Sequence, residues 1–288
     1  MIVARHLREL PTAERATAVG SFDGVHIGHQ AVLDTARQTD LRTTVVTFWP
    51  HPRLVLGNRV ELLSSLERRL ELLADEGIDE TLVLEFTAEL ARLEPGEFAE
   101  TILRRIGTRV VAVGENFRFG RGASGTPSML VDLGFEVRAI PLVKDASSTR
   151  IRQLLRAGSV EDAAKLLGRP PEVEGVVVLG DQRGGTLGYP TANLDVPPEL
   201  VVPRFGIYAG CALGQPAAVS IGVNPHYGGS ERRIEPYLLD FEGDLYGQRL
   251  VVELWKRLRD ERAFASEREL VEQIARDVEE TRAAIRPV

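Results

Sequence analysis

Hydrophobic positions in the first half of the chain follow two alternating patterns, short β-branched runs and longer stretches with helical spacing. The short runs are predicted strands at 17–20, 43–48, 81–86, 109–113 and 136–140. The longer stretches are predicted helices at 27–37, 62–75 and 95–106. Strands that alternate with helices indicate an α/β fold, a parallel sheet with helices on both faces. Ligands of such sheets bind beyond the carboxyl ends of the strands.

Two more helices are expected before the pattern changes. Ser148 or Thr149 can cap the first, which stops near Gly158. Ser159 with Asp162 resembles a capping box for the second. The break Gly168–Pro171 then interrupts the helical pattern. We therefore predict one domain over residues 1–168 and another over 171–288.

The second half has a different pattern, in which strands follow one another without helices between them. The predicted strands are 173–179, 205–213, 217–223, 233–241 and 250–258. Gly, Pro and Asp fill the gaps, as expected for an antiparallel barrel or sandwich. A closing helix begins at Ser266, which forms a predicted capping box with Glu269. Its predicted apolar stripe consists of Leu270, Ile274, Val278 and Ile285.

Composition narrows the class of protein. A chain of 288 residues, 43% hydrophobic and 27% charged, is long enough for two globular domains. The net charge of −7 argues against broad nucleic-acid binding, which needs a basic face. No segment has the apolar length of a membrane span or a secretory signal, so we expect a cytoplasmic protein without a membrane partner. Cys211, the single cysteine, excludes an intramolecular disulfide, and a homo-oligomer remains compatible with the sequence.

The most informative N-terminal stretch is VGSFDGVHIGHQ at 19–30, where a predicted strand ends, a turn follows and a helix begins. Helix N-termini attract phosphate through free backbone N–H groups and the helix dipole. His26 and His29 lie at this helix start and can donate further hydrogen bonds to a phosphate, while Gly28 lets the backbone approach closely. Two other interpretations stay open: a cation site, although no third ligand is near in sequence, and histidines that only face solvent.

The stretch FDGVHIGHQ resembles the signature of the nucleotidyltransferases that hold ATP by its phosphates, a superfamily with a Rossmann-like parallel sheet. Three later segments narrow the resemblance to the FMN adenylyltransferase module of bifunctional riboflavin kinase/FAD synthetases. They are TFWPHP at 47–52, GENFRFG at 114–120 and SSTRIR at 147–152. Four matches in the family's order are far more specific than a lone HxGH.

This resemblance implies a reaction in which a phosphate oxygen of FMN attacks the α-phosphorus of ATP and pyrophosphate leaves. His26 and His29 are then the expected catalytic residues, acting by positioning and charge stabilisation without a covalent nucleophile. The residues expected to bind ATP and its phosphates are Gly20, Phe22, Asp23, Gly28, His51, Asn116, Arg118, Ser148, Thr149 and Arg152. Arg118 and His51 have plain alternatives, a surface arginine and a turn histidine.

The second informative stretch is a glycine-rich loop from Gly180 to Gly188, followed by Pro190. It lacks the GxxxxGK[ST] pattern of a Walker loop, but its backbone N–H groups can still face phosphates. Thr191 and Asn193 alternate along an extended segment, so both side chains point the same way. A hydroxyl and an amide oxygen suit a hard Mg²⁺ ion that keeps most of its waters.

Four segments of the second half resemble the riboflavin kinase family: GDQRGGTLGYPTANL at 180–194, PRFGIYAG at 203–210, SIGVNPHYGG at 220–229 and IEPYLLDFEGDLYG at 234–247. The resemblance implies a six-stranded antiparallel barrel with a closing helix. It also implies that Thr191 and Asn193 bind Mg-ATP and that Glu235 is the catalytic base. The residues expected to bind ATP in this half are Gly180, Arg183, Gly188, Pro190, Thr191 and Asn193.

Glu235 alone would be read as a solvent-facing residue of an alternating strand; beside the other motifs it reads as the base that takes a proton from a primary hydroxyl. Departures from the usual motifs fall at Ser21, Trp49, Gly185, Val223 and His226, and they concern flavin-site detail.

The expected function is synthesis of FMN from riboflavin and of FAD from FMN, with ATP and Mg²⁺ in both steps. The alternatives are an enzyme with one active half, a non-catalytic flavin-binding regulator, and a related transferase acting on another phosphorylated small molecule.

Overall fold

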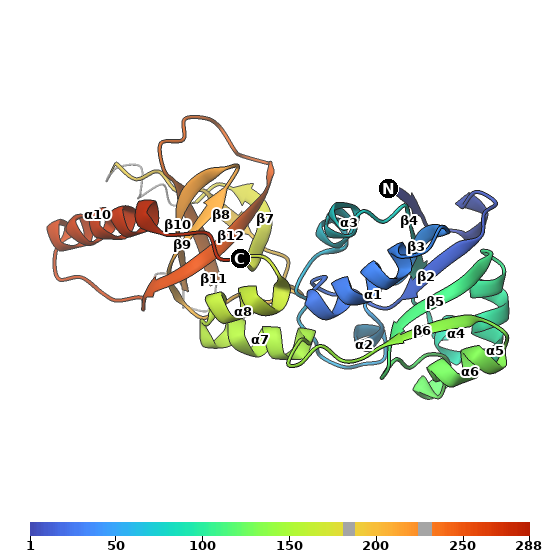
Figure 1. The fold of residues 1–288 in the computed structure, drawn as a ribbon. Helices are drawn as coiled ribbons and strands as arrows, with labels where there is room; N and C mark the ends of the chain where they lie inside the picture. Colours follow the sequence, from blue (N-terminus) through green and yellow to red (C-terminus); the bar gives the residue numbers. More distant parts are fainter. Residues whose placement is uncertain (181–187, 224–231) are drawn as a thin grey trace. The chain divides into compact units, whose positions relative to one another are not determined.

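The computed structural model describes residues 1–180, 188–223 and 232–288 (Figure 1). The chain forms two compact units, Met1–Ser148 and Thr149–Val288. The domain boundary expected at 168–171 stays a prediction. Three residues singled out in the sequence, Arg183, Gly185 and His226, lie outside the described residues.

The first unit is built on a six-stranded sheet with the order β1-β4-β3-β2-β5-β6, and every neighbouring pair is parallel. Its strands are β1 Ile2–Ala4, β2 Arg15–Val19, β3 Arg42–Trp49, β4 Glu80–Glu85, β5 Thr108–Gly114 and β6 Glu136–Ile140. The chain moves outward from β2 to β3 and β4, and then returns to the other side of β2 with β5 and β6. The predicted parallel α/β sheet is therefore confirmed, and β2 and β5 flank the point where the strand order reverses.

Helices cover both faces of this sheet (Figure 1). They are α1 Ile27–Arg37, α2 Pro52–Val55, α3 Leu66–Asp75, α4 Ala88–Arg92, α5 Pro95–Phe98, a π-helical segment Ala99–Arg104, and α6 Pro127–Asp132. On one face, Leu33 of α1 and Leu73 of α3 pack on the alternate strand residues Ala16 and Ala18. On the other, the π-helical segment and α6 pack on the intervening strand residues. Strands buried on both faces explain the nearly continuous apolar runs in the sequence.

A buried ion pair lies at the amino ends of the central strands. Arg15, the first residue of β2, donates from Nε to Oε2 of Glu80, the first residue of β4, at 2.8 Å. The Thr44 hydroxyl donates to the same carboxylate at 3.0 Å, and Arg42 lies 3.3 Å from its other oxygen. Arg15 also donates to the backbone oxygen of Ile106. These contacts join three strands at the edge opposite to the one where ligands of such sheets bind.

The second unit contains a six-stranded antiparallel sheet with the order β11-β10-β9-β12-β7-β8. Its strands are β7 Glu172–Val178, β8 Asn193–Asp195, β9 Gly206–Ala212, β10 Gln215–Val223, β11 Arg232–Leu238 and β12 Arg249–Arg259. At the two ends of this order, Ala192 N, just before β8, donates to Pro236 O in β11 at 2.9 Å. The sheet therefore closes on itself, which confirms the predicted six-stranded barrel.

Helices α7 Ser148–Ala157 and α8 Val160–Leu167 precede the barrel, and α10 Glu267–Ala283 follows it. Ser159 occupies the N-cap of α8, but its side chain makes no capping hydrogen bond, so the capping box expected there does not form. At α10 the expected cap is present, because Ser266 Oγ accepts from Glu269 N at 3.3 Å. In the described part of the chain, none of the helices combines the length and hydrophobicity needed to cross a bilayer.

The apolar stripe expected on α10 is right in part, because Leu270, Ile274 and Val278 are half-buried. The buried positions are polar, namely Gln273, Asp277 and Thr281, which follow one another at a spacing of four residues. Ile285 lies beyond the helix and is 87% exposed. Polar groups are buried there because they have partners: Asp277 accepts hydrogen bonds from Arg259 Nε and Nη2 at 2.9 and 2.6 Å.

Candidate active sites

Three sequence motifs of the first unit follow three adjacent parallel strands. The HIGH-type segment follows β2, the TFWPHP segment includes the end of β3, and the GENFRFG segment starts at the last residue of β5. Since the carboxyl ends of parallel strands meet at one edge of a sheet, these segments line the same edge. A hydrogen bond from Thr47 Oγ1 to Ser21 O at 3.2 Å joins the first two.

The turn between β2 and α1 is buried and has unusual backbone geometry. Phe22, Gly24 and Val25 all have positive φ angles, of 48°, 80° and 37°. For a β-branched residue such as Val25 this conformation is strained, and non-glycine residues held this way cost about 1–3 kcal/mol each. Gly24 is required as well, because a Cβ there would lie 2.7 Å from Leu63 Cδ1. Backbone strain of this kind is typical of functional sites.

His26 is the N-cap of α1 and is 6% exposed. Its Nδ1 accepts hydrogen bonds from the backbone N–H groups of Gly28 and His29 at 3.2 and 3.3 Å. We expected the backbone N–H groups at this helix start to face a phosphate, but those of Gly28 and His29 donate to His26 instead. Because Nδ1 is an acceptor, these hydrogen bonds assign the ring proton of a neutral His26 to Nε2, which is then a donor.

The two histidines form a stacked pair. Their ring centroids are 3.7 Å apart with an interplanar angle of 17°, and the Phe22 ring lies 5.2 Å from His29. Gly28 is close beneath this pair, since a Cβ there would lie 3.1 Å from His26 Cε1. A side chain at position 28 would thus push against the cap.

Asp23 connects the turn to two other segments. Its backbone oxygen accepts from Ser148 Oγ at 3.0 Å, which ties Ser148, the last residue of the first unit, to the HIGH-type turn. Its carboxylate accepts from Leu63 N at 2.8 Å and from Ser64 N at 3.3 Å. Asp23 is 1% exposed, and these hydrogen bonds hold backbone segments together, while its assignment to ATP binding stays a prediction.

The other residues expected to bind nucleotide differ in their surroundings. His51, buried, caps α2 by accepting from Arg53 N at 3.2 Å. Asn116 is exposed beyond β5. Its Oδ1 lies 3.3 Å from the position that a Cβ on Gly114 would take. Arg118 is exposed and donates to Phe117 O at 2.8 Å. The structure groups the motifs at one edge, while assignment of these side chains to nucleotide binding stays a prediction.

Thr149 and Arg152 belong to the second unit. Thr149 is exposed in the first turn of α7, and Arg152 is 6% exposed one turn further along the helix. Ser148 and Arg152 are four residues apart, so they lie on the same face of α7.

In the second unit, the segment after the glycine-rich loop lies beside β11. The hydrogen bond from Ala192 N to Pro236 O pairs the two chains, and the Tyr189 and Tyr237 rings meet edge to face at 5.5 Å. Glu235 shares with Tyr237 the half-buried face of β11, while Ile234, Pro236 and Leu238 face the core. The Glu235 side chain is 30% exposed, and Arg233 Nη1 is 3.7 Å from its Oε1.

Thr191 and Asn193 flank Ala192, and both are half-buried. Side chains alternate along extended segments, so positions 191 and 193 fall on the same side of this pairing as Glu235. Asn193 lies directly over Gly180, where a Cβ would be 2.0 Å from the amide nitrogen and 2.5 Å from Oδ1. Only glycine at position 180 leaves room for this amide.

The oxygen donors of Thr191 and Asn193 fit a hard cation such as Mg²⁺, which prefers oxygen ligands and keeps several waters. Gly180 supports this fit, because it leaves a space that the Asn193 amide occupies. Among the described residues, no group of three or more His, Cys, Asp and Glu side chains forms a metal cluster. Gly188 and Pro190, both exposed, stand just before these donors.

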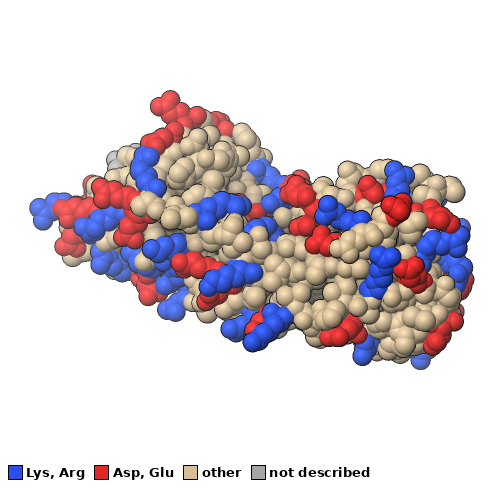
Figure 2. Space-filling model, in the orientation of Figure 1, with Lys and Arg blue, Asp and Glu red and all other residues tan. Residues whose placement is uncertain are grey.

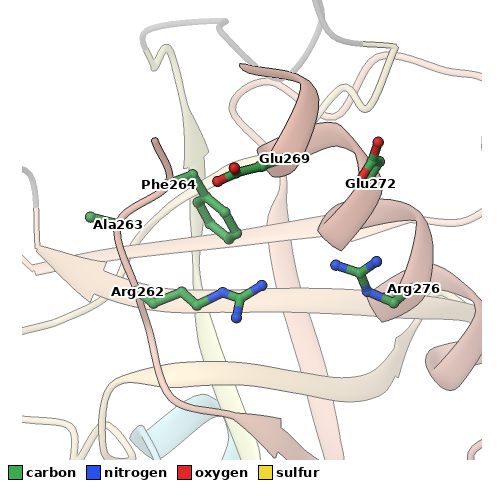
Figure 3. Close-up of a pocket in the computed structure, with 6 residues that line it drawn as sticks. All are labelled: Arg262, Ala263, Phe264, Glu269, Glu272 and Arg276. Atoms are coloured by element: carbon green, nitrogen blue, oxygen red, sulfur yellow. The ribbon is translucent and has the colours of Figure 1, made fainter. Parts of the chain in front are cut away.

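A pocket of about 200 Å³ lies between the end of β12 and the start of α10 (Figure 3). It is lined by Arg262, Ala263, Phe264, Glu269, Glu272 and Arg276. Figure 3 shows the guanidinium groups of Arg262 and Arg276 turned toward each other, with the Phe264 ring beside Glu269. Both guanidinium groups donate to Gln273 Oε1, at 2.6 and 2.9 Å.

Sequence reasoning missed this pocket. The available signal was an aromatic residue within a charged segment, RDERAF, directly before a helix cap. On the face shown in Figure 2, acidic and basic side chains are interspersed, so charge alone does not mark a site.

Comparisons with known proteins agree with this division of sites. A family model for FAD synthetase matches residues 10–153, and one for riboflavin kinase matches residues 167–285. The curated relatives include a bifunctional riboflavin kinase/FMN adenylyltransferase of Listeria monocytogenes, 35% identical over 93% of this chain and 92% of that protein. Relatives with the same name from Bacillus subtilis and Escherichia coli K12 are also 35% identical, over 96% and 94% of this chain and 94% and 93% of theirs.

One solved structure has the same fold along its whole length. It is described as a macrolide-efflux protein from Streptococcus pneumoniae, with a TM-score of 0.87, 33% identity and 98% coverage of both chains. Its name differs from those of the curated relatives, so this match supports the fold. The two family models and the chain-long curated relatives establish that this chain belongs to the bifunctional riboflavin kinase/FMN adenylyltransferase family.

Proposed function

We propose that the second unit phosphorylates riboflavin to FMN and that the first unit adenylylates FMN to FAD. The observation that carries the proposal is that each family model covers one half of the chain. Within each half, motif segments that are separate in sequence lie close together. A chain with only one working half, or a flavin-binding regulator, would not need both groupings.

For the adenylyl transfer, a phosphate oxygen of FMN forms a new bond to the α-phosphorus of ATP as the bond to pyrophosphate breaks. The negative charge that develops on the phosphoryl oxygens needs fixed donors. His26 Nε2–H is such a donor, because its Nδ1 is held by two backbone N–H groups. His29, stacked on it, is the second expected donor.

For the phosphorylation, the primary hydroxyl of riboflavin attacks the γ-phosphorus of ATP, and ADP leaves. Glu235 takes the hydroxyl proton as a general base. We propose that the Thr191 hydroxyl and the Asn193 amide oxygen hold a Mg²⁺ ion, which supplies charge neutralisation at the ATP phosphates. The pairing of residue 192 with Pro236 supports this arrangement, since it sets these donors and Glu235 on one face.

The proposal includes a cytoplasmic enzyme that acts on small molecules, because ATP, which donates a group in both steps, is supplied there. The test is to incubate the protein with riboflavin, ATP and Mg²⁺, and to separate FMN and FAD by chromatography. We expect FMN first and then FAD, and no product when a chelator removes the metal. FMN alone would limit the protein to the kinase, and no product would leave a flavin-binding protein.

A further inference from the structure

Arg69 of α3 is fully buried, which is unusual for a guanidinium group. Its Nη1 lies 3.5 Å from Phe48 O at the end of β3. Its Nε and Nη2 have no hydrogen-bond partner among the described residues. Burial lowers the pKa of Arg69, and the charge of Asp23 acts in the opposite direction.

A carboxylate of the HIGH-type turn lies close to one of these atoms. Arg69 Nη2 is 3.9 Å from Asp23 Oδ1, and both side chains are buried, at 0% and 2% exposure. The guanidinium carbon is 5.5 Å from the centre of the Trp49 ring. Arg69 therefore stands where the turn after β2, the end of β3 and the segment before α3 converge.

We propose that Arg69 is a positioning residue of the adenylyl-transfer site, acting through Asp23 on the turn that presents His26 and His29. This inference rests on the proposed function of the first unit. Asp23 holds Ser148 through its backbone oxygen and the segment before α3 through its carboxylate. Removing the guanidinium takes away a buried positive charge beside this carboxylate, and the turn then relaxes to bring the carboxylate closer to water.

A role in stability alone is a poor explanation for this arginine. A buried guanidinium with two nitrogens that have no hydrogen-bond partner loses the hydration of those atoms and regains little. An apolar side chain of similar volume commonly serves stability as well or better. What the charge adds is an electrostatic hold on Asp23, three residues before the cap of α1.

The test compares Arg69→Met, Arg69→Lys and the control Arg68→Met. Arg68 is the preceding residue of the same helix and pairs with Glu71 at 2.8 Å near the surface. Initial rates of FAD formation from FMN and ATP, initial rates of riboflavin phosphorylation, and thermal unfolding are measured for each.

We expect Arg69→Met to lower kcat for FAD formation by at least about tenfold, the scale of a misplaced catalytic group, with little change in KM. Phosphorylation stays at the normal rate, Arg69→Lys recovers part of kcat, and Arg68→Met matches the unmodified protein.

A second set of variants tests the route through Asp23 and does not depend on Arg69→Met alone. If Arg69 acts through Asp23, then Asp23→Asn lowers FAD formation and adding Arg69→Met lowers it little further. Independent, multiplying effects would overturn the inference. A normal kcat for FAD formation in Arg69→Met would also overturn it. The same holds if Arg69→Met and Arg69→Lys lose equal amounts of kcat in proportion to their loss of thermal stability. Failure of the proposed function is distinct, because the unmodified protein would then form no FAD, and the inference would fall with it.

Discussion

At the scale of single residues, the two ring nitrogens of His26 have separate tasks. Nδ1 caps α1, and Nε2 is the atom that we propose to donate to a phosphate. A change at this position therefore affects both the helix and the chemistry, and the two effects have to be separated by the choice of substitution.

We predict that His26→Ala lowers FAD formation by about 10²-fold or more, the scale of losing one fixed donor at a developing charge. It also lowers the stability of the first unit by about 1 kcal/mol, because the cap is lost. His26→Asn restores the cap, since asparagine is a good N-cap, but not the activity. Rates of both half-reactions and urea unfolding measure this. An Asn variant with normal FAD formation would mean that His26 serves only as a cap.

Glu235 is the second residue on which a prediction depends. Glu235→Gln keeps the shape of the side chain and removes its basicity, so riboflavin phosphorylation should fall by about 10²–10⁴-fold. Conversion of added FMN to FAD should continue, and riboflavin binding, followed by flavin fluorescence, should survive. Asp240 is a poor substitute base, because two hydrogen bonds from Arg282 lower the pKa of its carboxyl. Normal phosphorylation by the Gln variant would remove Glu235 from the mechanism.

At the scale of elements, buried polar residues of α10, the polar seam Gln273, Asp277 and Thr281, attach the helix to the barrel. Asp277 bonds to Arg259 of β12 and accepts from Gln273 Nε2 at 2.9 Å. Gln273 in turn holds Arg262 and Arg276 beside the pocket. The helix and the pocket wall are thus parts of one hydrogen-bond network.

We predict that Asp277→Asn lowers the free energy of unfolding of the second unit by about 1.5–3 kcal/mol, the range for hydrogen bonds to charged groups. Glu280→Gln, an exposed change on the same helix, should change it by less than about 0.5 kcal/mol. Denaturant unfolding followed by circular dichroism measures both. Equal effects of the two substitutions would show that the seam does not hold the helix.

The elements that follow simple patterns could be predicted from the sequence, and α1 was predicted at its observed bounds, Ile27–Arg37. Hydrophobic spacing found the half-buried residues Leu270, Ile274 and Val278 of α10 but not its fully buried ones, because those are polar and depend on partners distant in sequence. Strand β8, with three residues, was too short to give a pattern. The motif residues indicated which segments form the sites, but Arg69 belongs to no motif, and only its burial beside Asp23 identified it.

At the scale of the whole molecule, the helices before the barrel belong with the second unit. Val160, Ala163, Ala164 and Leu167 of α8 are buried, and α8 packs on β12. Leu155 O in α7 accepts from Arg204 N at 3.0 Å, and Pro171 O accepts from Leu254 N at 2.8 Å. A barrel cut at Pro171 would keep its strands and lose these helices.

We therefore predict that fragments 149–288 and 171–288 both phosphorylate riboflavin, and that the longer one is more stable. Each large apolar side chain left exposed by removing α7 and α8 costs about 1.5–3 kcal/mol of burial. Urea unfolding of both fragments, with initial rates at low temperature, checks this. Equal stabilities would contradict the packing argument, and a folded but inactive longer fragment would contradict an independent kinase unit.

The buried pair Arg15–Glu80 has a consequence for how the first unit can vary. It anchors the amino ends of β2 and β4, whereas His26 and His29 follow the carboxyl end of β2. The stabilising ion pair and the proposed adenylyl-transfer site thus lie at opposite edges of one sheet. Mutant libraries selected for heat resistance and for altered substrate preference should accumulate changes at different edges, so that improvements of the two kinds can be combined in one chain with little mutual interference.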